Sequence, residues 1–392
     1  MAPYCLLFGF TGIFGFILCE FKKSRKSDLI FLIILTGILI VMASVRAHTV
    51  GVDTEVYMDY FSNMVGRSPS FLVSKENIYW REPAYSLLNF IFAKITNSPA
   101  VFMGIVSGLI IGLRSIFIYR YSSKIWLSVF IYITFGFFGY AMCTLRQELG
   151  ISVALFALPF LQKRKIIPYM LIVILAACFH ISLWVMIPVY FFVHIPFNKV
   201  TLQILGAGTV LLLIFSEHIL TVITKVVYQN YQPGSYYTLG RDYSTAVFPV
   251  LFFILSLLLM KKLLTNNPEN IVLMHFSCYS AVLFILTIRH FVFQRIALIF
   301  LPVVLLLIPE LLECAAPDPN KVEELLRLQG LDKSRQKQQK DKMASLMGEH
   351  KNAVTLYYTV MGLLMAGCIT YYLFLLSANR LGLVPYIPFW KL

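Results

Sequence analysis

The sequence places three adjacent polar side chains inside a largely apolar chain. Arg146, Gln147 and Glu148 stand in CTLRQELGISVAL, residues 143–155, with apolar residues on both sides. A guanidinium group binds phosphate oxygens in bidentate fashion, and a carboxylate can remove a proton from a hydroxyl group. These residue types therefore predict chemistry on a phosphate-bearing substrate.

Further polar side chains of the same kinds occur in stretches far apart along the chain. They are Arg46, Asp53 and Tyr57 in residues 46–61, Glu82 before Pro83, His180 in AACFHISLWVMIP, Tyr236 and Tyr237 in PGSYYTLGRDYS, and Arg289 and Arg295 in RHFVFQR. Histidine suits proton removal near neutral pH, and tyrosine rings can stack on sugar faces. Each signal alone has a plainer reading: an arginine reaching for lipid headgroups, a histidine packed between helices, or an aromatic belt at the membrane surface.

The composition indicates that these residues are carried by membrane helices. Of 392 residues, 59% are hydrophobic and only 13% are charged, and the mean hydropathy is +0.77. Soluble domains have about 25% charged residues, and a helix needs about 20 apolar residues to cross a bilayer. We expect one all-α integral membrane domain over 1–392, a polytopic transmembrane bundle with about twelve crossings, at 3–19, 29–45, 99–118, 125–145, 146–162, 166–179, 181–197, 200–216, 244–260, 270–287, 294–310 and 354–376.

The cysteine usage and the charge distribution exclude several classes of site. The 7 cysteines are scattered and form no CxxC or Cys/His cluster, so we expect no disulfide framework, metal site or cofactor. The net charge of +14 is concentrated in loops between apolar segments, which argues against a nucleic-acid partner. The run 3–19 lacks a basic region before it and a clear cleavage site, so we expect a retained helix rather than a signal peptide.

The basic clusters predict which loops face the cytoplasm. With the N-terminus outside, FKKSRK, QKRK and the basic loop 311–353 all lie inside, as the positive-inside rule requires. Loop 311–353 is then a cytoplasmic insert, expected to be a helical hairpin or partly disordered, which either rests on anionic lipids or is simply solvated. The apolar stretch 82–95 would reverse this topology if it crossed. We therefore interpret it as a re-entrant or interfacial helix, with an ordinary crossing as the alternative.

This topology brings the unusual polar groups to the outer face of the membrane. A charged residue at a helix centre costs about 2.5–3.5 kcal/mol on insertion scales, so such groups persist when paired, hydrated or functional. Arginines, carboxylates, a histidine and tyrosines in one outer cavity suit a lipid diphosphate sugar whose tail lies in the bilayer.

At these residues the chain resembles the EpsG family of bacterial exopolysaccharide polymerases, which act like the Wzy-type polymerases. The resemblance rests on a series of motifs that occur in the family's order over roughly residues 29–310. One departure is visible: Gly150 and Ile151 stand where small, alanine-like residues are expected after the RQ motif. The motifs are R-x4-G-x-D-x3-Y at Arg46, Gly51, Asp53 and Tyr57, E-P-x-[YF] at Glu82, Pro83 and Tyr85, LRQ-x-[LA] from Leu145, FHIS from Phe179 followed by Pro188, and the late pair Arg289 and Arg295.

The resemblance implies a membrane glycosyltransferase of GT-C-like architecture in the bacterial plasma membrane, acting at the extracytoplasmic face. Such an enzyme transfers a growing glycan from undecaprenyl diphosphate to an incoming lipid-linked oligosaccharide. It works among membrane lipids, with a flippase and a chain-length regulator as expected partners, and it needs no nucleotide sugar, cofactor or metal.

Within this interpretation the site residues take distinct expected roles. Arg146 and Arg289 bind the donor diphosphate, and Arg46 or Arg295 binds a second one. The proton acceptor is His180, then Glu82, then Asp53 in order of preference. Expected sugar contacts are Tyr57, Tyr236, Tyr237 and Glu148, and Glu148 alternatively orients Arg146.

Three other functions remain open from the sequence. An O-antigen ligase would use the same donor with a terminal acceptor. A flippase for the same lipid should show two related halves with broken helices, and we find no internal repeat. A membrane scaffold would use the polar cluster only for structural ion pairs.

Overall fold

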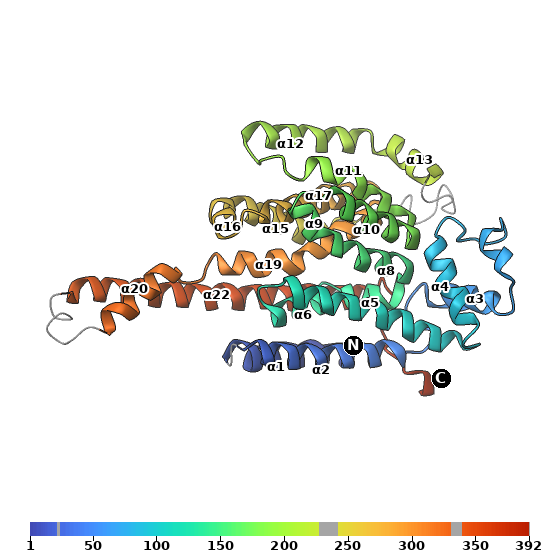
Figure 1. The fold of residues 1–392 in the computed structure, drawn as a ribbon, viewed down its shortest axis with the longest axis horizontal. Coiled ribbons are helices and arrows are strands. Elements are labelled where there is room, and N and C mark those ends of the chain that lie inside the picture. The colour runs from blue at the N-terminus through green and yellow to red at the C-terminus, as the bar shows by residue number, and fades with distance from the viewer. Residues whose placement is uncertain (22–23, 227–241, 331–338, 392) are drawn as a thin grey trace.

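The computed structural model describes residues 1–21, 24–226, 242–330 and 339–391. Within these residues every named element is a helix, and one isolated β-bridge pairs Arg46 with Pro388. Figure 1 shows most of the helices running side by side along the long axis of the molecule. A helix satisfies its own backbone hydrogen bonds, which is why apolar runs of this composition fold as helices in lipid.

Several helices are long and apolar enough to cross a membrane, so the chain is a multi-pass membrane protein. Five reach that length alone, and the count rises to eight if each bent pair is one span. The five are α1 (Ala2–Gly15) extended to Glu20, α2 (Arg25–Ser44), α5 (Pro99–Tyr121), α18 (Phe293–Phe300) continued through α19 (Val304–Glu313), and α22 (Lys340–Ala378). The pairs are α6 (Ile125–Thr134) with α7 (Phe137–Cys143), α12 (Lys199–Ile214) with α13 (Ser216–Val226), and α15 (Val247–Leu258) with α16 (Met260–Asn266).

The predicted segments all fall on helical structure, but several of these helices are short. Those shorter than a span are α8 (Leu145–Ala154), α9 (Leu158–Gln162), α10 (Ile166–Phe179), α11 (Met186–Phe192) and α17 (Asn270–Leu286). Length and composition thus support five to eight spans, and the predicted twelve crossings stay a prediction. The α6–α7 pair bends by 56° beside Gly136, whose φ of 78° is a left-handed conformation that favours glycine.

The two ends of the bundle carry different structures (Figure 1). At one end lie α3 (Thr54–Met64) and α4 (Pro83–Ala93), and we call it the α3–α4 end. Helix α4 has 11 residues, about 16 Å, which is too short to cross a hydrocarbon core of about 30 Å. The sequence prediction of a non-crossing helix in 82–95 agrees with this length.

At the opposite end lie two packed helices, which we call the hairpin, within the insert 311–353, for which the sequence left a helical hairpin or a partly disordered segment open. Helix α20 (Pro319–Gln329) packs against the start of α22 through Leu325, Leu328 and Leu346. Lys321 pairs with Glu349 at 2.6 Å. Because these contacts join α20 to α22, the hairpin has a small core of its own.

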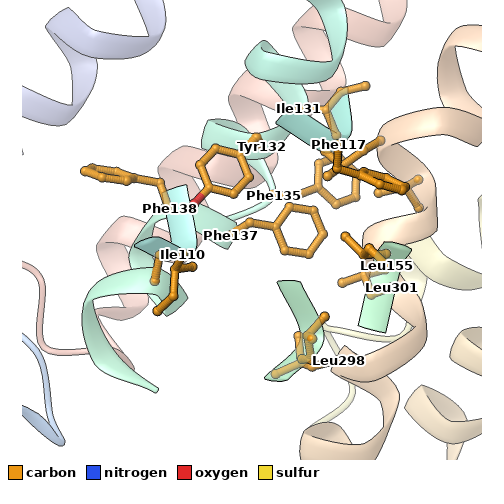
Figure 2. Close-up of a cluster of buried hydrophobic side chains, with 14 of the residues drawn as sticks. Ile110, Phe117, Ile131, Tyr132, Phe135, Phe137, Phe138, Leu155, Leu298 and Leu301 are labelled. Carbon is orange, nitrogen blue, oxygen red and sulfur yellow. The ribbon is translucent and has the colours of Figure 1, made fainter. Parts of the chain in front are cut away.

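The part of the main core drawn in Figure 2 lies between α5, α6, α7 and α18. Figure 2 shows the rings of Tyr132, Phe135 and Phe137 gathered beside Leu298 and Leu301, which come from α18 and the turn after it. All five side chains are buried. Lipid tails are as apolar as these side chains, so close van der Waals packing rather than transfer out of water stabilises the helix contacts.

The predicted orientation can be tested with two introduced cysteines. Ser70 lies exposed at the α3–α4 end, and Ser345 lies exposed in the hairpin. We expect a membrane-impermeant thiol reagent to label Ser70→Cys in intact cells and Ser345→Cys only after permeabilisation. The unsubstituted protein gives the background from its native cysteines, and the opposite labelling pattern would reverse the orientation.

Candidate active site

An ion pair between Glu82 and Arg146 forms the centre of the candidate site. Glu82 immediately precedes α4, and Arg146 is the second residue of α8. Nη1 of Arg146 contacts Oε2 of Glu82, and their side chains are 18% and 5% exposed. The Glu82 side chain does not cap its own helix, so its carboxylate is turned toward α8.

Two tyrosine rings flank the guanidinium of Arg146. Its Cζ lies 3.8 Å from the ring centroid of Tyr79 and 5.9 Å from that of Tyr57. A cation over an aromatic face is attracted by about 0.5–2 kcal/mol, depending on its solvation. The stacking fixes the plane of the guanidinium, which a ligand needs for bidentate contact.

His180 lies at the break between α10 and the short helix η4 (Ile181–Val185), facing the same carboxylate. Its Nε2 is 3.9 Å from Oε1 of Glu82, which also accepts a hydrogen bond of 3.2 Å from the backbone N–H of Ile181. Nδ1 of His180 accepts from the backbone N–H of Ser182 at 3.3 Å. Nδ1 also lies 2.7 Å from the Ser182 hydroxyl, and when Nδ1 accepts both of these bonds the proton of the neutral ring is on Nε2.

The charge state of His180 follows from its surroundings. Burial holds the pKa of His180 well below its usual value, and the positive charges of Arg146 and Arg295 lower it further. The imidazole is therefore neutral at pH 7. With Nδ1 already accepting a hydrogen bond, the ring is placed to donate from Nε2 rather than to accept a proton.

Asp53 and Arg295 lie near the same cluster. Burial raises the pKa of Tyr57, and the charges near its ring also act on it: Arg146 and Arg295 lower this pKa, and Asp53 raises it. Arg295 belongs to α18, and its backbone carbonyl accepts a hydrogen bond from Nε2 of Gln147. This contact ties the start of α18 to the start of α8.

A cavity adjoins the cluster on the side of Asp53 and Arg295. Its volume is about 100 Å³, and its polar lining residues are Asp53, Tyr140, Thr144, Gln147, Thr245, Gln294, Arg295, Asn379 and Arg380. Its apolar lining residues come from α22, namely Tyr372, Phe374, Leu375, Leu376 and Ala378, and from elsewhere in the fold, namely Val52, Phe291, Leu298, Leu381 and Leu383. The cavity thus combines two guanidinium groups, three amides and a carboxylate with a largely apolar wall, in a space large enough for a phosphate-sized group.

Two residues that line this cavity, and Arg146 next to one of them in sequence, each have a buried polar atom without a hydrogen-bond partner within the described residues. These atoms are Oε1 of Gln147, Oγ1 of Thr245 and Nε of Arg146. Buried polar atoms are bonded in more than about 90% of cases, so unsatisfied ones indicate a role for water or a ligand. Two of these atoms belong to the adjacent residues Arg146 and Gln147.

The other residues predicted for the site lie elsewhere. Glu148 is 1% exposed and pairs with Arg114 of α5 at 2.9 Å, so Arg146 is oriented by Glu82 and not by Glu148. Arg46 is buried and donates to Ser107 at 3.3 Å and to the carbonyl of Met142 at 3.0 Å. Its other donation goes to the carbonyl of Ala43.

Two further predictions concern residues that are not found in contact with the cluster in the described part of the chain. Arg289 lies in the turn between α17 and α18. Among the described residues it takes part in none of the contacts of Glu82, Arg146 and His180 given above. Tyr236 and Tyr237 lie outside the described residues. The roles predicted for all the site residues stay predictions.

The sequence analysis did not identify Tyr79 or Arg380 as site residues. Tyr79 precedes Glu82 by three residues, so its proximity to a predicted site residue was an available signal. Arg380 follows the last apolar run and gives no such signal, because only the folded C-terminal segment brings it to the cavity.

Gly150, a departure from the expected motif, has a packing reason in this chain. A Cβ at this position of α8 would lie 3.0 Å from the carbonyl oxygen of Ala176 in α10. Helices α8 and α10 therefore approach each other closely at this residue. This contact brings the start of η4, and with it His180, next to Arg146 and Glu82.

The comparisons with known proteins give one match. The model of the EpsG family matches residues 29–322, which include every described residue of the cluster. No curated protein and no solved structure matches the chain.

Proposed function

Because the chain belongs to the EpsG family, whose membership implies a role in polysaccharide biosynthesis, we propose that it is a polysaccharide polymerase of the plasma membrane. It joins undecaprenyl-diphosphate-linked repeat units at the extracytoplasmic face. The observation that carries this proposal is the Arg146 guanidinium, held by Glu82 and Tyr79, beside Arg295 and a carboxylate-bearing cavity.

Arg146 and Arg295 bind the diphosphate of the donor lipid. Glu82 and the two tyrosines hold Arg146 in one orientation, while its Nε keeps a free donor. Preorganised positive charge stabilises the negative charge that grows on a leaving diphosphate. The neutral imidazole of His180 presents Nε2 to Oε1 of Glu82 at 3.9 Å, which helps to keep that carboxylate beside Arg146.

Asp53 is the proton acceptor that the geometry favours over His180 and Glu82. Both oxygens of Glu82 are engaged, and Nδ1 of His180 accepts a hydrogen bond. Asp53 lines the cavity and forms no ion pair among the described residues. Its carboxylate takes the proton of the acceptor hydroxyl as that oxygen bonds to the anomeric carbon.

The same step breaks the bond between the anomeric carbon and the diphosphate oxygen. Both bonding electrons leave with undecaprenyl diphosphate, and the glycan remains on the lipid of the incoming unit. We further propose that the helices form a GT-C-like bundle with about twelve crossings. A flippase would deliver the lipid-linked units to this enzyme, and a chain-length regulator would set the length of its polymer.

Reconstitution tests the proposed function directly. Purified protein in liposomes is mixed with lipid-linked repeat units isolated from cells that lack their polymerase. We expect a ladder of products that remain on undecaprenyl diphosphate, together with released undecaprenyl diphosphate. If the lipid crosses the bilayer without elongation, the protein is a flippase and not a polymerase. If the glycan is transferred once to a terminal acceptor, the protein is a ligase.

A further inference from the structure

The C-terminal segment is attached to the first loop of the α3–α4 end by backbone hydrogen bonds. The N–H of Gly51 donates to Gly382 at 2.9 Å, and the N–H of Val52 donates to Leu381 at 3.1 Å. Further along, the N–H of Ala47 donates to Ile387 at 2.8 Å. The segment is therefore fixed immediately beside Asp53.

A tight turn at the end of α22 directs Arg380 toward the cavity. The helix ends at Asn379, whose φ of 45° is left-handed. The Asn379 side chain closes the turn by donating to the carbonyl of Val384 at 2.6 Å and accepting from its N–H at 2.9 Å. Arg380 follows this turn and lines the cavity with Arg295 and Asp53.

A buried carboxylate holds the Arg380 guanidinium. Oδ2 of Asp242 accepts from Nη1 of Arg380, while Oδ1 accepts from the N–H and the hydroxyl of Ser244 at 2.9 and 2.8 Å. The Asp242 side chain is 1% exposed and that of Arg380 is 37% exposed. An arginine has five N–H donors, so this pair leaves donors of Arg380 for the cavity.

We propose that Arg380 is a further binding residue for the lipid diphosphate, acting with Arg295, which lines the same cavity. The proposal rests on the proposed function. Two guanidinium groups facing one cavity match the paired phosphates of a diphosphate, since each group can bind oxygens through parallel N–H donors. Arg380 also lies beyond residue 322, so this contribution comes from outside the family match.

The test measures binding of undecaprenyl diphosphate, without sugar, to the full chain in nanodiscs. Arg380→Gln alone would leave Asp242 buried without its partner, so the informative variant is Arg380→Gln with Asp242→Asn. We expect it to bind roughly 10- to 100-fold more weakly, as for the loss of a charge-assisted contact. Arg67→Gln is the matched control, because Arg67 is exposed at the same end and stacks on Phe71 at 4.7 Å.

Arg295→Gln separates the two ways in which the experiment can fail. If Arg295→Gln weakens binding and the double variant binds like the unsubstituted protein, Arg380 serves only the ion pair and the inference is overturned. If neither variant changes the affinity, or the unsubstituted protein does not bind, the proposed diphosphate site itself is wrong.

Discussion

Arg146→Gln combined with Glu82→Gln abolishes chain extension while the protein still folds and inserts. Removing one preorganised charge from a comparable site lowers the rate on the order of 10²–10³-fold. The paired change matters because Arg146→Gln alone leaves the Glu82 carboxylate, 5% exposed, without its guanidinium. The measurement is the length distribution of lipid-linked polymer in the reconstituted assay.

Arg146→Lys supplies the complementary variant. It keeps the positive charge beside Glu82, yet a point charge cannot reproduce the planar fork between Tyr79 and a phosphate. We expect normal yield and at least a roughly tenfold slower extension, between the double variant and the unsubstituted protein. Arg67→Gln should extend normally, and polymer of ordinary length from the double variant would remove Arg146 from the mechanism.

Arg114→Met destabilises the protein more than any single change at the cavity. Arg114 and Glu148 are each 1% exposed and pair at 2.9 Å, and Nε of Arg114 donates to Ser152 at 2.9 Å. Removing one partner of a buried pair costs about 3–5 kcal/mol, because the other charge stays buried without compensation. The thermal unfolding midpoint in detergent measures the loss.

The double variant Arg114→Met with Glu148→Met separates charge from packing. Replacing both charges by apolar side chains of similar size should recover most of the stability lost in Arg114→Met. If Arg114→Met alone unfolds at the original temperature, the pair does not hold α5 and α8 together. Chain extension in the double variant then reports whether the pair also positions Arg146, two residues before Glu148.

The positions of helices were largely predictable, whereas their bends were not. Apolar runs mark where a helix must form, since each run has to satisfy its backbone within lipid. The bend at Gly136 depends on a left-handed residue, which a glycine permits but does not require. Long apolar runs were therefore easy to recognise as helices, whereas the number of complete crossings could not be predicted from them.

The sequence could predict those residues of the candidate site that are polar within an apolar stretch. Glu82, Arg146 and His180 each interrupt apolar sequence, and the structure brings them together. The pairing of Glu148 with Arg114 was not predictable, because it depends on how α5 and α8 are rotated against each other. Arg46 resembles a site residue in sequence, but the fold surrounds it with backbone carbonyls.

The Arg114–Glu148 pair also constrains how the nascent chain is made. Arg114 leaves the ribosome 34 residues before Glu148, so α5 must wait in or beside the translocon with an uncompensated cation. On insertion scales such a cation costs about 2.5–3.5 kcal/mol at a helix centre, and α8 carries its own charges. Helix α5 alone is long and apolar enough to span despite this cost, whereas α8 has only 10 residues, so α8 should enter the bilayer against an α5 that is already in place.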